Sequence, residues 1–463
     1  MKRAVLAAAL LALAGCAAGP DYKRPDMPLP AAFDGAAAEA AAPPPARWWQ
    51  LYSDPLLDGL VGEALSANAD LRLAAARVLE AEGVWREVRA ALFPEVDGAF
   101  SYSNSRASTR VVPAPLAPLE RPMYQGLAST TFEADFWGRL SRASEAARAS
   151  LLASEYARDV VALTLAGTVA QTYFGLRSLD AQLKVLEQTI RSRSESLQLT
   201  RDRLNAGIAS ELDVHQAQGA LSDALVQRRD TERQRALLER ELGQLTGRLD
   251  LRLAAGDLFV LPVPPPPPAG RPSALLERRP DIRAAEQALA AANAQIGVAR
   301  AALFPTVSLT GTLGAQSANL SNLFTGGAGI WSAGFALALP IFDAGRREAR
   351  VDQAGARERQ ALAGYQKAIE TGFKEVSEGL INVAQSTATE GDLQDRLQAA
   401  RNALELSNLR YESGYSPFLE VLDAQRTAND AELAFVRNRQ ARLSFSVDLM
   451  KALGGGWQPL HVD

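Results

Sequence analysis

The sequence contains one structural unit written twice, and this internal repeat constrains the fold more than any other feature. The segment Arg203–Gln218 returns as Arg410–Gln425 at an offset of 207 residues. A second segment, Ala91–Val96, returns as Ala302–Val307 and keeps its Ala-Leu-Phe-Pro core. The sequence therefore predicts two equivalent structural repeats, at residues 47–260 and 273–456.

A glycine lies at the centre of each copy of the longer motif. Gly207 and Gly414 are suited to the left-handed conformation that ends a helix without a Cβ penalty. Three residues later, Ser210 suits a helix N-cap and Pro417 suits the first turn of a helix. Each copy is therefore predicted to be a tight turn between two helices.

Composition argues against catalysis and against nucleic-acid binding. The 463 residues are 47% hydrophobic and 22% charged, with a net charge of -4, so there is no basic surplus for nucleic acid. Two histidines and one cysteine leave little material for a catalytic or metal site. Carboxylates are spread along the expected helical faces, where solvated charge is the expectation. We predict no catalytic residues, no metal ligands and no enzyme activity.

The N-terminus has the pattern of a lipoprotein signal peptide. Lys2 and Arg3 precede the apolar run Ala4–Ala14, which is too short to span a bilayer. The only cysteine, Cys16, follows Leu-Ala-Gly in a sequence that resembles a bacterial lipobox. This resemblance implies removal of residues 1–15, lipid attachment at Cys16, and, because Ala17 rather than Asp follows, an outer-membrane destination. A cluster of acyl chains can hold a protein to one leaflet.

Proline-rich segments separate the repeats from their surroundings. Residues 16–46 are rich in proline and alanine, which predicts an extended, lipid-anchored tether with little core of its own. Residues 261–272 predict a stiff linker between the repeats, and residues 457–463 form a short tail.

Two hairpins of alternating polarity are expected, at about residues 96–136 and 307–339. Each contains two strands of about nine to eleven residues, a length that crosses a bilayer when the strand is tilted. Four ordinary strands of a soluble core are the alternative. The flanking long helices and the lipobox favour the membrane. Small or apolar residues recur at every second position, as in Val96, Gly98, Phe100 and Tyr102, and as in Val307, Leu309, Gly311 and Leu313.

A helix of unusual length follows each hairpin. Residues 141–204 and 346–411 contain no proline, and each segment would extend about 95 to 100 Å as a helix. Apolar residues recur in alternating steps of four and three, which is typical of a coiled-coil seam. Return helices are predicted at residues 211–246 and 418–453, and short helices at residues 55–65, 69–92 and 280–303.

Four strands in lipid leave two open edges whose unpaired amide groups are too costly to tolerate. A single chain cannot close a barrel, because barrels need at least about eight strands. Two copies would provide eight strands around a filled interior, and three copies would provide twelve around a channel. The small, polar inner face favours three copies.

These residues together resemble the TolC family of outer-membrane channels, in the lipoprotein branch typified by OprM and NodT. The resemblance is carried by the lipobox, Gly19–Tyr22, Trp48-Trp49 with Asp54-Pro55, both Leu-Phe-Pro copies and both glycine turns. It implies an α+β membrane protein: a homotrimeric, twelve-stranded outer-membrane β-barrel, with four strands per chain, continued by a long periplasmic α-helical barrel. It further implies passive export of drugs or other small molecules. Energy would come from an inner-membrane pump of the resistance-nodulation-division type, acting through a periplasmic adaptor.

The resemblance also suggests roles for individual residues. Lipid attachment would be at Cys16, with no other cofactor. The turns at Gly207, Ser210, Gly414 and Pro417 would form the tip that contacts the adaptor, although a purely structural role is equally consistent with their residue types. The periplasmic gate would comprise Leu419, Asp423, Arg410 and Tyr411.

In this arrangement three Asp423 side chains around a narrow axis would attract cations, and Arg410 with Tyr411 would tie neighbouring hairpins together. Alternatively, Asp423 would be an ordinary solvated carboxylate on the face of a helix. Tyr415, Ser416 and Pro417 make the second turn bulkier than the usual turn of the family. His215 replaces the leucine of the second repeat and is expected to be an exposed spacer.

Other functions fit the sequence less well. The same architecture would serve type I protein secretion or metal efflux, although no Met-, His- or Cys-rich tract favours soft metals. A lipid-anchored, non-porous coiled-coil scaffold would explain the helices but not the alternating strands. An enzyme is the weakest option.

Overall fold

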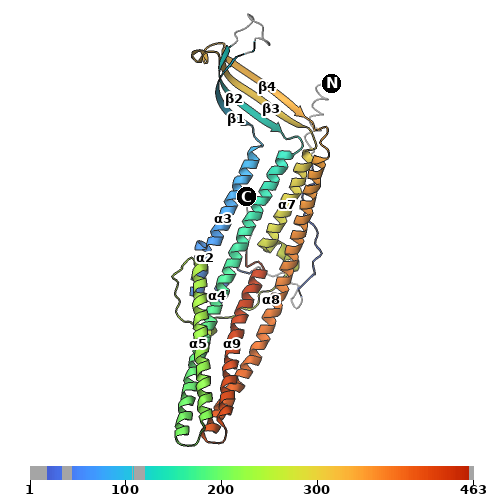
Figure 1. Cartoon of the computed structure of the whole chain (residues 1–463). Helices are drawn as coiled ribbons and strands as arrows, with labels where there is room; N and C mark the ends of the chain where they lie inside the picture. Colours follow the sequence, from blue (N-terminus) through green and yellow to red (C-terminus); the bar gives the residue numbers. More distant parts are fainter. Residues whose placement is uncertain (1–17, 34–43, 107, 109–119, 458–463) are drawn as a thin grey trace. The chain divides into compact units, whose positions relative to one another are not determined.

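A computed structural model describes residues 18–33, 44–106, 108 and 120–457 (Figure 1). The chain divides into two compact units. The sheet unit comprises Met1–Asp26, Arg77–Glu155 and Ala284–Gln366, and the helical unit comprises Met27–Ala76, Tyr156–Arg283 and Lys367–Asp463. The elements in chain order are η1 (Trp48–Tyr52), α2 (Pro55–Ala67), α3 (Ala69–Ala90), β1 (Glu95–Arg106), β2 (Glu120–Ala134), α4 (Arg139–Asn205), α5 (Glu211–Thr246), η2 (Leu258–Val260), η3 (Pro272–Ala274), α6 (Leu275–Arg278), α7 (Pro280–Ala301), β3 (Thr306–Ser317), η4 (Leu320–Asn322), β4 (Gly329–Ala338), α8 (Arg346–Glu412) and α9 (Phe418–Ala452).

The described strands form one antiparallel sheet in the order β1-β2-β3-β4. The central pair, β2 with β3, joins the two repeats, so β1 and β4 lie at the edges. The strands have 12, 15, 12 and 10 residues, and three of them are longer than the nine to eleven residues predicted. The extra length of the first hairpin comes from pairing that continues past the alternating segment as far as Arg106 opposite Glu120.

The register of the sheet sorts its side chains onto two different faces. Residues directly opposite each other in antiparallel strands point to the same side. The row Gly98, Ala128, Leu313 and Trp331 is therefore on one face, and the row Asp97, Ser129, Thr312 and Ser332 on the other. Trp331 and Phe335 on the apolar face are 78% and 79% exposed. The sheet thus presents an apolar face to its surroundings and a mainly polar face opposite.

Aspartates start the two long helices in the same way. Asp135 accepts hydrogen bonds from the backbone N–H groups of Leu140 at 3.0 Å and Ser141 at 2.7 Å. Asp343 accepts from the N–H of Arg347 at 3.3 Å. Because Asp135 satisfies the first free N–H groups, α4 starts at Arg139, two residues before the expected start at residue 141. Each long helix contains 67 residues.

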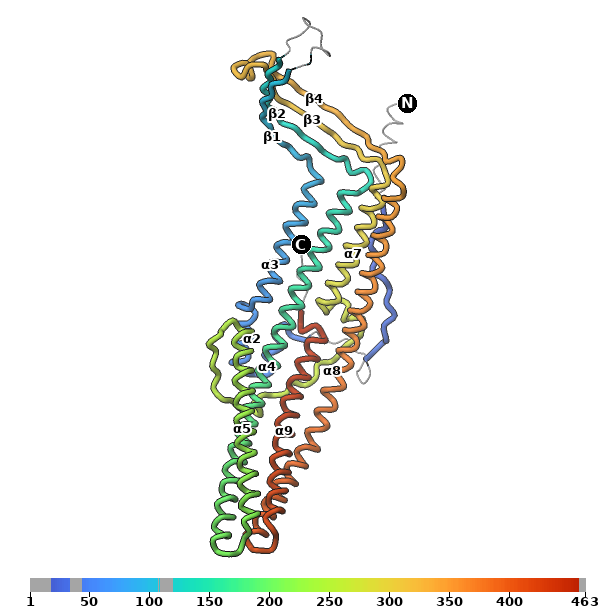
Figure 2. Tube along the Cα trace, viewed as in Figure 1, coloured from blue at the N-terminus to red at the C-terminus, as the bar shows by residue number. Residues whose placement is uncertain are grey.

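The helical unit contains two long helical hairpins, traced in Figure 2: the α4 and α5 segments and the α8 and α9 segments. Its main core joins both repeats. Trp48 and Tyr52 of η1 are fully buried among Phe174 of α4 and Leu443 and Val447 of α9. The Tyr52 hydroxyl lies 2.6 Å from Ser446 Oγ. Residues of η1 therefore hold the C-terminal part of α9 in place.

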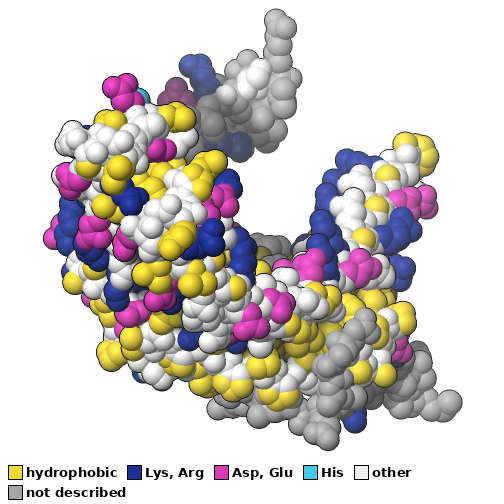
Figure 3. Space-filling view, turned by 90° about the horizontal axis from the view of Figure 1, so that it is seen from below, with side chains coloured by type: hydrophobic (Ala, Val, Ile, Leu, Met, Phe, Trp, Pro, Cys, Tyr) yellow, Lys and Arg dark blue, Asp and Glu magenta, His cyan; other side chains and the backbone are white. Residues whose placement is uncertain are grey.

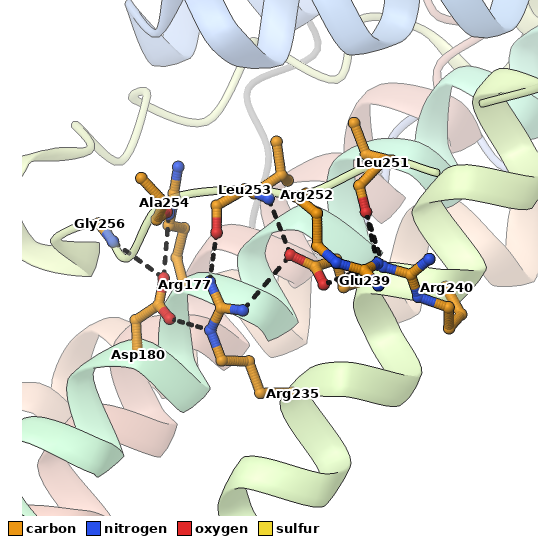
Figure 4. Close-up of polar contacts among 10 residues, drawn as sticks. All are labelled: Arg177, Asp180, Arg235, Glu239, Arg240, Leu251, Arg252, Leu253, Ala254 and Gly256. Carbon is orange, nitrogen blue, oxygen red and sulfur yellow. Dashed lines mark hydrogen bonds and ion pairs between the residues drawn. The ribbon is translucent and has the colours of Figure 1, made fainter. Parts of the chain in front are cut away.

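An internal ion-pair network holds the connector that follows α5 (Figure 4). Asp180 Oδ2 accepts from Arg177 at 2.9 Å and from the N–H of Gly256 at 2.9 Å, while its Oδ1 accepts from Arg235 at 2.6 Å. Arg177 and Arg235 donate in turn to the backbone carbonyls of Ala254 and Leu253. The Asp180 side chain is only 1% exposed.

Glu239 has a similar role in the same network. Its Oε1 accepts from the N–H of Leu253 at 2.8 Å, and its Oε2 lies 3.1 Å from Arg240. The expectation of solvated charge along the helices was therefore wrong for Asp180 and Glu239. Sequence spacing alone could not show that a connector from outside the helices covers them.

The segment after the predicted lipid site makes specific contacts. In the sheet unit, Arg24 forms a two-pronged ion pair with the buried Glu286, at 2.7 and 2.9 Å. The carboxylate of Asp21 pairs with Arg142 of α4. The Ala18 N–H donates to Trp137 O at 2.8 Å. We call residues 18–26 the strap. Cys16, the signal peptide, residues 34–43 and residues 458–463 lie outside the described residues.

Candidate functional site at the two helical tips

The two glycine turns have the same backbone geometry. Gly207 and Gly414 have φ values of 75° and 80°. In the first turn, the N–H of Ile208 donates to Arg203 O at 2.9 Å; in the second, that of Tyr415 donates to Arg410 O at 2.8 Å. These bonds satisfy carbonyl groups at the helix ends and leave Ile208 and Tyr415 exposed. Both tips therefore present an apolar side chain beside the glycine.

The helices that leave the turns start differently. Ser210 forms a capping box with Asp213, in which each side chain bonds the other residue's backbone N–H. Pro417 was expected in the first helical turn, but it occupies the N-cap position of α9 and provides no side-chain cap. A proline ring has no acceptor atom, so the start of α9 lacks the hydrogen bonds that hold the start of α5.

Arg203 ties the two tips together within the helical unit. Its Nη1 donates to Tyr411 O at 2.7 Å and its Nη2 donates to Glu412 O at 3.0 Å. Its guanidinium also lies over the Tyr411 ring, 4.5 Å from the centroid. In the sequence, Arg203 is recognisable only as the first repeat's equivalent of Arg410. Every residue has a backbone carbonyl group, so the sequence does not show which carbonyl groups accept hydrogen bonds from Arg203.

The residues expected to tie neighbouring hairpins have partners within the same chain. Tyr411 is buried, and its ring lies 5.3 Å from that of Phe418 in a small core with Leu197 and Val421. The buried Tyr411 hydroxyl makes no hydrogen bond within the described part of the chain. Arg410 forms an ion pair with Glu420 at 3.1 Å. Arg410 thus helps to hold its own hairpin together, whereas Tyr411 contacts both its own hairpin and the first hairpin of the same chain.

The two hairpins also interlock above the tips through polar side chains. Gln425 Nε2 donates to Ser196 Oγ at 2.9 Å, and Thr189 Oγ1 donates to Asn429 Oδ1 at 3.1 Å. Arg193 of α4 donates to Ala220 O of α5 at 2.5 Å, and burial lowers its pKa. Three helices, α4, α5 and α9, are therefore joined near the tips by contacts that are not purely apolar.

Two of the proposed gate residues, Leu419 and Asp423, lie on the exposed face of α9. Leu419 is 61% exposed, and the Asp423 side chain is 65% exposed. Asp423 is not isolated, because Arg426 donates to its Oδ1 at 2.8 Å. His215 is exposed on α5, as expected of a spacer. Figure 3 shows acidic and basic side chains interspersed on the visible face.

Two kinds of functional feature have no counterpart among the described residues. Among them, no group of three or more His, Cys, Asp or Glu side chains is placed to hold a metal ion. No helix in this part of the chain combines the length and the apolarity needed to cross a bilayer.

Comparison with known proteins identifies the family. The model of the outer membrane efflux protein family matches residues 60–248 and 272–455, and thus most of both repeats. The chain belongs to this family. It is 36% identical to the solvent efflux pump outer membrane protein SrpC of Pseudomonas putida, with 97% of each chain covered. It is also 36% identical to the cation efflux system protein CusC of Escherichia coli, again with 97% of each chain covered.

Solved structures agree with this assignment. The fold matches a membrane protein from Pseudomonas aeruginosa with a TM-score of 0.89 and 34% identity, covering 96% of this chain and 98% of the other. It matches the open state of the MtrE outer membrane channel of Neisseria gonorrhoeae with a TM-score of 0.86 and 30% identity, covering 96% and 99%. The predicted fold class is thereby confirmed.

As an outer membrane efflux protein, the chain is a channel component of an efflux system, is located in the outer membrane and is not an enzyme. Membership excludes the non-porous scaffold that the helices alone would have allowed. The four-stranded sheet is part of this channel fold. In such a channel, partner proteins and solutes are expected to contact the exposed residues at the tips.

Proposed function

We propose that three copies of this outer membrane efflux protein form a passive export channel for drugs or other small molecules. A periplasmic adaptor would contact the glycine turns, and an inner-membrane pump of the resistance-nodulation-division type would supply the energy. Cys16 would carry the lipids of an anchor.

The main support is the sheet, with its one apolar face and two open edges. β1 is exposed along its whole length, and so is nearly all of β4. Amide groups at such edges cannot remain unpaired in lipid. Pairing β1 of one copy with β4 of the next would satisfy both edges. Three copies would place the mainly polar face around a water-filled channel.

The tips supply the support for an adaptor. Ile208 is 69% exposed and Tyr415 is 81% exposed, each directly after its glycine. Aromatic residues are enriched in protein interfaces, and a backbone near glycine allows close approach. The two equivalent turns would offer an adaptor two similar contacts per copy.

The gate is assigned to the second hairpin. Leu419 and Asp423 are four residues apart, so they lie on the same exposed face of α9. Rings of these side chains from three copies would narrow the pore near its periplasmic end. The missing side-chain cap at Pro417 would let this end of α9 move more easily than the start of α5.

The gate is tested by conductance. The double substitution Leu419→Ala with Asp423→Ala is expected to raise single-channel conductance in planar bilayers severalfold, because it removes both rings. The matched control is Leu212→Ala with Gln216→Ala, the equivalent positions of the first repeat, of which Leu212 is also exposed. Chemical cross-linking should show a trimer for every variant. A double variant with wild-type conductance would remove these residues from the gate.

Metal efflux is the second candidate function, because the cation efflux protein CusC is as similar to this chain as the solvent efflux protein is. Type I protein secretion would use the same architecture. The absence of a Met-, His- or Cys-rich tract from the sequence favours organic solutes over soft metals.

A further inference from the structure

The exposed stripe of α9 carries alternating charge. After Leu419, the exposed charged residues Asp423, Arg426, Asp430 and Arg437 follow at steps of three, four and seven, which keeps them on one side of the helix. Each of the two carboxylates is thus followed along the helix by one guanidinium group. Over residues 419–437, these four charged side chains together have no net charge.

The residues nearest the tip are paired directly. Arg426 Nη2 lies 2.8 Å from Asp423 Oδ1, one helical turn away. Arg410 is 3.1 Å from Glu420, the carboxylate in the first turn of α9. Both acidic groups at the start of this helix therefore have a basic partner of the same chain.

We propose that Arg426 is a specificity-determining residue that neutralises the ring of Asp423 side chains. The inference rests on the proposed function, in which α9 faces the pore and Asp423 lies at its constriction. Three bare carboxylates would select cations strongly. Three Asp423–Arg426 pairs have no net charge, so the constriction admits anionic, zwitterionic and cationic solutes of suitable size.

This proposal does not require a strong ion pair. Both side chains are largely exposed, and exposed pairs add little to stability. The electrostatic potential that acts on an ion in the pore depends on the sum of the nearby charges. A single uncompensated charge about 4 Å away in water changes the local occupancy of a monovalent ion about fivefold. Removing Arg426 would leave three such charges around the axis.

The test is the ratio of potassium to chloride permeability, obtained from reversal potentials of purified channels across a salt gradient. Arg426→Gln is expected to raise this ratio at least about fivefold, and Asp423→Asn to lower it by a similar factor. The double variant should return close to the wild-type ratio. Arg233→Gln is the matched control, because Arg233 forms the same type of pair with Asp230 on α5, at 2.6 Å.

The possible outcomes separate this inference from the gate itself. If Asp423→Asn shifts the ratio but Arg426→Gln does not, Arg426 does not neutralise the ring, and the inference is overturned while the gate stands. If neither substitution shifts the ratio, the inference is also overturned. Unchanged conductance of the Leu419→Ala, Asp423→Ala variant would then remove the gate as well. A shift in the Arg233→Gln control would show a non-specific charge effect and would equally overturn the inference.

Discussion

Arg203 illustrates how a single residue organises the tip. Its guanidinium reaches two backbone carbonyls and one aromatic ring of the other hairpin. Such a fork suits arginine, because lysine presents a point charge without fixed directions. The link joins the first hairpin to Tyr411 and Glu412, three and two residues before Gly414, so motion of the second tip must strain or break it.

Substitution of Arg203 should therefore loosen the second turn. In Arg203→Gln, the amide protons of Gly414 and Tyr415 are expected to exchange at least about tenfold faster, because hydrogen bonds to a charged group contribute about 1.5–3 kcal/mol. Hydrogen exchange read by mass spectrometry over residues 411–418 measures this change. Arg201→Gln is the control, since among the described residues Arg201 donates to Gln218 of its own hairpin and not to the second hairpin.

Retained protection in Arg203→Gln would mean that the small core around Tyr411 and Phe418 holds the tips without the arginine. Arg203→Lys should give an intermediate result, because it keeps the charge and loses one of the two carbonyl contacts.

Individual residues differ in how far the sequence could predict their role. Gly207 and Gly414 were predictable, because a repeated glycine before a helix start signals a required positive φ. The role of Arg203 was not, because its acceptors are backbone carbonyls. The pairing of Asp423 with Arg426 was visible in principle as an i, i+3 spacing, and it weakens the expectation of a strongly cation-selective ring.

At the scale of elements, the connector after α5 depends on buried charge. Asp180 accepts hydrogen bonds from two arginines and from the backbone of Gly256. Removal of one member of a buried ion-pair network leaves the other charges uncompensated, which destabilises a protein by about 3–5 kcal/mol. The connector at residues 249–256 is thus held by a few specific bonds.

Asp180→Asn should release that connector. We expect the midpoint of thermal unfolding to fall by several degrees and residues 249–256 to become sensitive to a protease of broad specificity. Asp230→Asn is the control, because Asp230 pairs with an arginine of its own helix at an exposed position. Unaltered stability together with an intact connector would show that the arginines find other partners.

Secondary structure was easier to predict than this network. The steps of four and three along the chain predict long helices, and the alternation of polarity predicts four strands. Asp180 and Glu239 look like surface residues of α4 and α5 in the sequence. Only the three-dimensional path of residues 249–256 buries them.

At the scale of the whole molecule, residues 18–26 of the strap follow a fixed course. The pairs Arg24–Glu286 and Asp21–Arg142 hold it to α7 and α4 in the sheet unit. A lipid at the proposed site, two residues before Ala18, would be joined to the strap by at most about 7 Å of extended chain. The strap therefore limits where the proposed lipids enter the membrane.

The anchor itself is tested by labelling. Cys16→Ala is expected to abolish incorporation of labelled palmitate, because the proposed acceptor thiol is removed. Ala18→Cys in the same background is a control for position, since a cysteine outside the lipobox should remain unlabelled. Label retained in Cys16→Ala would place the lipid on another residue.

The exposed apolar side chains of the strands bear on the order in which the parts of the chain fold. A newly made copy that had folded its four strands alone would offer Trp331 and Phe335 to the aqueous periplasm. Segments with their own buried core, such as the one around Trp48 and Tyr52, do not offer such side chains to water during transit. The strand segments are therefore expected to travel unpaired, shielded by a holdase chaperone, and to fold last, when sibling chains and acyl tails arrive together.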